Sequence, residues 1–88
     1  MSRRVWKFPL DLEAGLQSLR LPQETRIVHV AMQAGAPTLW ALIDTGAPTV
    51  QRDFVIRATG EPVAIDETYV GTVFTEIFVW HVFEVVPV

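Results

Sequence analysis

Short runs of Val, Ile, Phe, Trp and Thr alternate with polar residues along this chain, and Gly, Pro or Asp interrupts them at intervals of about 8–12 residues. Side chains on a β-strand point to alternate faces, and tight turns need residues with permissive backbones. No segment shows the helical period over a useful length. The pattern therefore predicts an all-β protein, a small antiparallel β-sandwich or barrel of about six or seven short strands with little or no helix.

One hairpin is the clearest element in this pattern. Residues 26–33 and 38–44 form its arms, and the four-residue loop 34–37 contains the Gly and Pro that such turns favour. Strict alternation places Ile27 and Val30 on opposite faces of the first arm, and both faces are largely apolar. We therefore expect the first arm to be a central strand of its sheet.

The remaining strands are expected on either side of this hairpin, and turns are expected at 10–15, 45–48 and 60–62. The expected strands are residues 5–9, residues 17–21 ending at Pro22, residues 50–59, a brief strand at 63–65, and two strands within 68–86 that part at Gly71 or near Thr75–Glu76.

The length and hydrophobicity of the chain bear on its assembly. With 88 residues there is room for a single domain, 1–88, with a thin core. Half of the residues are hydrophobic, three are Trp, and the mean hydropathy is +0.30. Soluble monomers rarely leave large apolar patches in water, so we expect a homo-oligomer.

The charge and the cysteine content indicate which binding partners and which cellular compartment to expect. The net charge is −3 and the pI is about 5.2, which argues against nucleic acid as a partner. Arg3, Arg4 and Lys7 crowd the N-terminus, where we expect a fraying, solvated end; a phosphate-facing patch is the alternative. The chain has no Cys, no signal-peptide pattern and no apolar run near the ~20 residues of a membrane span, so we expect a cytoplasmic protein that does not enter a membrane.

One motif is typical of an enzyme. An apolar strand leads into Asp44-Thr45-Gly46, as in the dimeric aspartic proteases of retroviruses, where Asp44 would share a proton with its dimer mate. The Gly-rich flap and the downstream apolar-Gly segment of those enzymes are missing. Asp before Thr-Gly is also an ordinary way to leave a strand and enter a turn. We therefore interpret this motif as a turn and expect no enzymatic activity.

Other catalytic or metal-binding arrangements find little support. The two histidines, His29 and His81, lack neighbours at ligand spacing, so we expect no metal site and no cofactor. Ser18 lies in no nucleophile elbow, and no Gly-rich phosphate loop is present.

Aromatic residues near cations are the better functional candidates. Aromatic rings can stack on a base or anchor an interface, and Arg or Lys can meet a phosphate or carboxylate. The residues chosen on this basis are Trp6, Lys7, Trp40, Arg57, Tyr69, Trp80 and His81. For the three Trp residues, core or oligomer contact is the alternative interpretation; for Arg57, as for Arg52, it is solvated surface.

Several strings along the chain resemble a family of short proteins of unknown function found in tailed phages and prophages. These strings are VWKF from Val5, LWALID from Leu39, Arg52 and Phe54, ATG from Ala58, YVGT from Tyr69 and FVWHVFE from Phe78. The resemblance covers nearly the whole chain. In that family the position of Thr45 is often Pro, so the protease-like triplet does not belong to the shared pattern. The resemblance implies a small protein made in the cytoplasm of an infected bacterium.

Three functional hypotheses follow. The first is a non-enzymatic binding module with an anti-defence role, which occludes a host protein or sequesters a nucleotide-like signal between subunits. The second is a structural or assembly accessory whose aromatic residues serve oligomer contacts. The third is a dimeric aspartic protease acting through Asp44-Thr45-Gly46.

Overall fold

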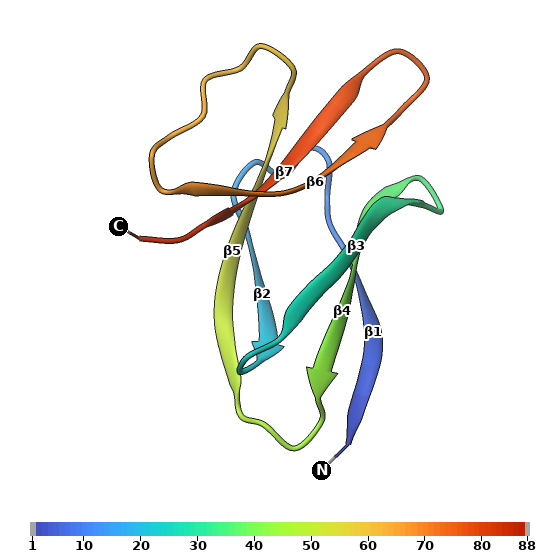
Figure 1. Ribbon diagram of the computed structural model, residues 1–88. Helices are drawn as coiled ribbons and strands as arrows, with labels where there is room; N and C mark the ends of the chain where they lie inside the picture. The colour runs from blue at the N-terminus through green and yellow to red at the C-terminus, as the bar shows by residue number, and fades with distance from the viewer. Residues whose placement is uncertain (1, 88) are drawn as a thin grey trace.

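The strands form two antiparallel sheets in the computed structural model, which describes residues 2–87 (Figure 1). The strands are β1 (Arg3–Pro9), β2 (Gln17–Pro22), β3 (Arg26–Gln33), β4 (Ala36–Asp44), β5 (Thr49–Ala58), β6 (Glu67–Phe74) and β7 (Val79–Val85). Sheet A has the order β1-β4-β3, and sheet B has the order β2-β5-β7-β6. The all-β prediction is confirmed, and the described residues contain no helix.

The β3–β4 hairpin is present, but its turn is shorter than expected. Gln33 pairs with Ala36, so the loop consists of Ala34 and Gly35 alone. Both have positive φ, 50° and 79°, as a two-residue type I′ turn requires. Pro37 therefore lies within β4, where its side chain is fully buried.

Strand β3 lies at the edge of sheet A, so the prediction of a central strand was wrong. Its alternation is also broken by a bulge between Ile27 and His29, which adds Val28 to the strand. As a result Ile27 and Val30 both pack against the core, while Val28 is half exposed. The apolar character of β3 has a different cause, because this edge strand packs against β6 of sheet B.

The approach of β3 to β6 depends on Gly71. A second bulge lies between Tyr69 and Gly71, and a Cβ atom on Gly71 would come within 2.7 Å of Val30 Cγ2 and 2.9 Å of Val30 Cβ. Only a residue without a side chain fits there. Two of the four outer strands, β3 and β6, thus lie against each other, which leaves β1 and β2 as the other sheet edges (Figure 1).

The core lies between the two sheets and draws on nearly every strand. Its buried members are Leu10, Leu21, Leu39, Phe54, Ile56 and Val82. Phe54 and Ile56 of β5 face inward as predicted. Asp53 and Arg57 lie on the opposite face, but that face is not uniformly solvated, because Val55 between them is buried. Full burial of such side chains contributes about 1.5–3 kcal/mol each.

The expectations for the turns and the short strands are confirmed only in part. Turns occur as expected at 45–48 and 60–62, and β6 and β7 part near Thr75 and Glu76. The brief strand expected at 63–65 is absent: this segment is an irregular connection in which Ile65 is 91% exposed. Pro22 does not stop β2 but forms its last residue, which an edge strand tolerates.

Candidate functional site

The residues chosen from the sequence do not form one site. They fall into three groups: Trp6, Lys7 and Trp40 on sheet A; Arg57, Tyr69 and His81 on the outer face of sheet B; and Trp80 against the core. The three Trp residues lie on strands, as predicted. Their separation means that stacking and charge pairing on one small ligand would draw on only one group within a single subunit.

The outer face of sheet A carries an aromatic residue between two basic side chains. Lys7, Trp40 and His29 are directly opposite one another on β1, β4 and β3, and opposed residues of an antiparallel sheet point to the same face. The rings of His29 and Trp40 are 5.8 Å apart and tilted by 49°. Lys7 Nζ donates a hydrogen bond to Gln33 Oε1 at 2.7 Å. Trp40 is half-buried, whereas Lys7 and His29 are exposed.

Strand β1 is the most exposed strand of the sandwich. Five consecutive residues are exposed: Arg3, Arg4, Val5, Trp6 and Lys7, which we call the basic edge. It pairs with β4 on one side only, and Figure 1 shows it at the outer border of sheet A. Arg3, Arg4 and Lys7 are solvated as expected, but they are paired with β4 from Arg3 onward, so the expectation of a fraying end was wrong.

Charge is distributed unevenly between the two sheets. Arg3, Arg4, Lys7 and Arg26 lie on the strands of sheet A, whose only acidic residue is Asp44. The other nine acidic residues lie on sheet B or in the connections. The whole chain has a net charge of −3, but sheet A taken alone is cationic, and the basic edge lies along one side of this sheet.

The arginines of sheet B are already paired with carboxylates of the chain. Arg52 binds Glu84 through two bonds of 2.7 Å and donates a third, of 2.6 Å, to the carbonyl of Thr25. Arg57 binds Glu67 through bonds of 3.1 and 2.5 Å. The hydrogen bond to Glu84 raises the pKa of Arg52, and the hydrogen bond from Arg57 lowers the pKa of Glu67.

A chain of hydroxyl contacts surrounds His81 on the outer face of sheet B. Its Nδ1 lies 3.0 Å from Thr72 Oγ1, and its Nε2 lies 2.8 Å from Thr59 Oγ1. The hydroxyl of Tyr69 continues the chain, 2.6 Å from the Thr72 hydroxyl, while its ring meets Phe83 edge-on at 5.8 Å. Both ring nitrogens of His81 are thus satisfied within the sheet.

Trp80 is mainly a structural residue in this arrangement. It packs against the core, donates from Nε1 to Thr75 Oγ1 at 3.3 Å, and contacts Phe78 with ring centres 5.5 Å apart. This geometry is the core contact that was the alternative interpretation for the Trp residues.

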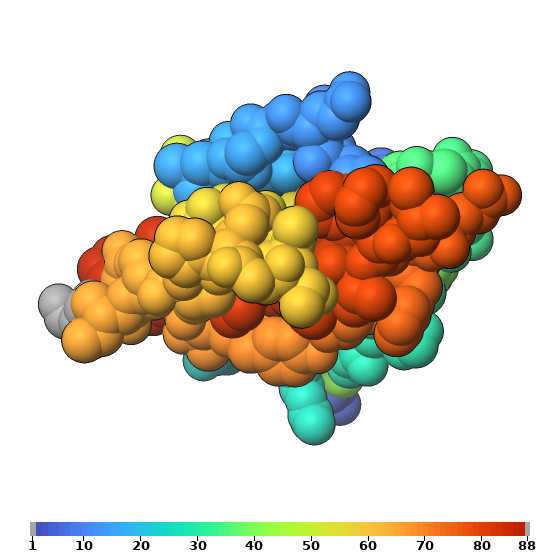
Figure 2. All heavy atoms as spheres, turned by 90° about the horizontal axis from the view of Figure 1, so that it is seen from above, coloured from blue at the N-terminus to red at the C-terminus, as the bar shows by residue number. Residues whose placement is uncertain are grey.

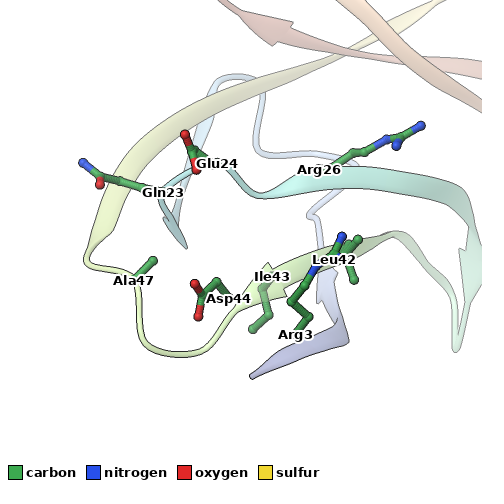
Figure 3. Close-up of a pocket in the computed structure, with 8 residues that line it drawn as sticks. All are labelled: Arg3, Gln23, Glu24, Arg26, Leu42, Ile43, Asp44 and Ala47. Carbon is green, nitrogen blue, oxygen red and sulfur yellow. The ribbon is translucent and has the colours of Figure 1, made fainter. Parts of the chain in front are cut away.

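The Asp44-Thr45-Gly46 motif forms a turn at one end of sheet A. Asp44 Oδ1 accepts a hydrogen bond from the Gly46 amide at 2.9 Å, and the Thr45 amide donates to the carbonyl of Ser2 at 2.9 Å. Asp44 borders a shallow groove of about 370 Å³ (Figure 3). In that view Asp44 points toward the groove, whereas Arg26 points away from it. The described residues contain no cluster of three or more His, Asp or Glu side chains that could hold a metal ion.

The family of the chain is identified by sequence comparison. Residues 1–88 match a domain of unknown function, DUF7352. The chain belongs to this family. No curated protein and no solved structure matches the chain.

Membership of DUF7352 confirms that the chain belongs to an uncharacterised domain family, as the resemblance implied. The strings that carried the resemblance lie largely on strands, LWALID within β4 and most of FVWHVFE within β7. Among residues 2–87, none forms a helix with the length and hydropathy of a membrane crossing.

Three basic residues on the strands of sheet A were not selected from the sequence of this DUF7352 protein. Arg3 and Arg4 were expected at a solvated end, with a phosphate-facing patch as the alternative, and Arg26 was not considered. The available signal was the pair Val5-Trp6 flanked by Arg3, Arg4 and Lys7. A single sequence does not reveal that this run occupies an edge strand.

Proposed function

We propose that this protein is a non-enzymatic binding module that docks onto a partner protein through its basic edge. The observation that carries the proposal is the contrast between the two sheets. Arg52 and Arg57 are held in internal ion pairs, whereas Arg3 and Arg4 are exposed on a strand with one free side. A cationic surface with Trp6 and Val5 between its charges is suited to an acidic protein surface.

The resemblance to phage and prophage proteins supplies the setting of the proposal. In an infected bacterium, such a module would act in the cytoplasm by occluding a host protein, with a defence protein as the target. Its uneven charge would steer the encounter, because a basic surface accelerates association with an acidic partner.

The geometry favours a protein partner over a nucleotide-like signal. A base and a phosphate need an aromatic ring and cations that converge. On sheet A only Lys7 and His29 flank Trp40, and Lys7 already donates to Gln33, while Arg57 and His81 lie on sheet B. A protein partner has no such requirement, since an extended surface can contact a whole strand. Binding of a nucleotide-like signal between two subunits would bring the separate groups together, so the experiment must be able to detect it.

Capture from phage-infected cells tests the proposal. The tagged wild-type chain is compared with the triple variant R3E/R4E/K7E and with R20E, which reverses the charge of an exposed arginine on the edge strand of sheet B. We expect a partner protein that is captured by the wild type and by R20E but not by the triple variant. Circular dichroism of each variant verifies folding.

Three results would count against the proposal. Equal capture by all three proteins would mean that the basic edge is not the contact. A wild-type chain that carries only a nucleotide-sized mass in native mass spectrometry would favour sequestration instead. Cleavage of a host protein that stops in D44N would restore the protease hypothesis.

A second candidate function, a structural accessory, is favoured by the β6–β7 hairpin. Phe74, Ile77 and Phe78 are 69%, 80% and 52% exposed at its tip. Figure 2 shows this hairpin, in orange to red, at one end of the upper surface, with the β5–β6 connection reaching the other end. We propose that this tip contacts another copy of the chain. Sedimentation equilibrium of the wild type and I77K tests it, and a wild-type monomer would contradict it.

A further inference from the structure

The free side of β1 presents a defined set of backbone groups. In an antiparallel pair, alternate residues direct both their N–H and C=O toward the partner strand, and the residues between them direct both groups away. The Thr45 amide bonds to the Ser2 carbonyl, and the Leu10 amide bonds to the Pro37 carbonyl. These two bonds lie at either end of the β1–β4 pairing and show which residues of β1 direct their backbone groups toward β4.

The groups that face away from β4 therefore belong to the odd-numbered residues. Ser2, Arg4, Trp6, Phe8 and Leu10 bond toward the β4 side, in keeping with the pairing register. Arg3, Val5 and Lys7 direct their N–H and C=O groups outward. Pro9 has no N–H, so it ends the set.

Self-pairing of this edge is disfavoured by its charges. If two β1 strands paired antiparallel about Val5, Arg3 of each copy would lie opposite Lys7 of the other. Like charges directly opposite each other destabilise a strand pair, and cations on edge strands are a common protection against aggregation. The same charges attract an acidic strand, so the edge discriminates between these two occupants.

We propose that β1 binds an extended acidic segment of the partner protein as an additional antiparallel strand of sheet A. This inference rests on the proposed function and specifies its chemistry. Main-chain hydrogen bonds to Arg3, Val5 and Lys7 hold the segment, as in other β-strand additions. Antiparallel addition continues the pairing of β1, β4 and β3.

The side chains of β1 define the sequence that the segment needs. Residues opposite Lys7, Arg4 and Arg3 are acidic, and residues opposite Trp6 and Val5 are apolar. Read from its own N-terminus, the antiparallel segment is acidic, apolar, apolar, acidic, acidic. Both sides of the strand take part, because Lys7 and Arg3 project to one face of sheet A and Arg4 and Trp6 to the other.

A synthetic peptide tests this geometry directly. The probe has the core Glu-Val-Val-Glu-Glu between Gly-Ser ends, and its dissociation constant is measured by NMR titration of the folded protein. N-methylation of its third residue removes an N–H that faces Val5, whereas N-methylation of its second residue alters an N–H that faces solvent. We expect about tenfold weaker binding for the first probe and little change for the second.

Variants of Val5 provide the matching test on the protein. V5P removes the outward N–H and leaves the bonds toward β4 intact, while V5A keeps the N–H and truncates the side chain. We expect V5P to lose at least about tenfold in affinity relative to V5A. The titration spectra of the two variants show whether each retains the wild-type fold.

Each outcome separates this inference from the proposed function. Equal binding by V5P and V5A, or by the two methylated probes, would overturn strand addition. If V5P also still captured a partner that R3E/R4E/K7E loses, the proposed function would stand without it. Tighter binding of an oligo-dT strand than of the peptide, or strand exchange with a second copy of the chain, would overturn the choice of occupant.

Discussion

Replacement of Gly71 by Ala should destabilise the protein although it adds only one methyl group. The new Cβ would lie 2.7 Å from Val30 Cγ2 and 2.9 Å from Val30 Cβ. Rotation of the Val30 side chain can move Cγ2 but not Cβ, because the backbone of β3 fixes the position of Cβ. Relief therefore requires β3 and β6 to separate.

The magnitude follows from two opposing effects. Overpacking of this kind costs about 1–3 kcal/mol, whereas removal of a glycine from a strand recovers about 0.5–1 kcal/mol. The net loss in the free energy of unfolding should be about 1–2 kcal/mol, or roughly 10 °C in Tm for a domain of this size. Urea denaturation of the wild type and G71A measures it.

The variant V30A supplies the control for this prediction. It removes the two γ-carbons that meet the new methyl group and keeps Cβ, which would lie 2.9 Å from it. The double variant G71A/V30A therefore relieves part of the overlap and should be more stable than the sum of the single effects by about 1 kcal/mol. A G71A protein as stable as the wild type would refute the close packing of β3 on β6, and strict additivity in the double variant would mean that the overlap is with Val30 Cβ alone.

Three further predictions concern stability. R52A leaves the carboxylate of Glu84 and the carbonyl of Thr25 without their partner and should cost about 2 kcal/mol in urea denaturation, whereas R20A should stay within about 0.5 kcal/mol of the wild type; equal losses would contradict the role of the pair. The pKa of Glu67 is lowered in the folded state, so the ionised side chain adds to the free energy of unfolding above the ordinary Glu pKa, and this addition is lost as the pH falls through the lowered pKa of the folded protein. E67Q should therefore lose less stability than the wild type as the pH falls in the acid range. An unchanged acid dependence would count against the ion pair. A34N should stabilise the hairpin by about 0.5 kcal/mol, because Asn tolerates positive φ better than Ala; a less stable variant would argue against the type I′ turn.

Alternation predicted the strands well because it reports a local property. The spacing of apolar residues located β3 at its observed bounds and the inward row of β5, since each depends on neighbouring residues alone. The bulge at Val28 escaped prediction because one additional residue reverses the faces of a strand without any mark in its composition. The edge position of β3 was not predicted for another reason. Its apolar residues are buried by contact with β6, and a central strand would bury residues of the same kind.

The candidate site was less accessible from sequence because it depends on partners distant along the chain. Arg52 and Arg57 were considered as ligands for phosphate or carboxylate, and they do bind carboxylates, but those of Glu84 and Glu67. Once these pairs are known, three of the remaining exposed cations lie together on β1. Lys7 was chosen for its aromatic neighbours, and its position on a free strand edge became visible only in the fold.

Hydrogen exchange of individual amides tests the central claim, that β1 is a free edge that accepts a strand, most directly. In the protein alone, the amides of Arg3, Val5 and Lys7 should exchange fast, and those of Arg4 and Trp6 slowly, because only the latter are bonded to β4. Addition of the acidic peptide should slow the three fast amides and leave the β2 edge unchanged. Fast exchange that persists at Val5 with the peptide bound, or protection that develops along β2 instead, would contradict the account.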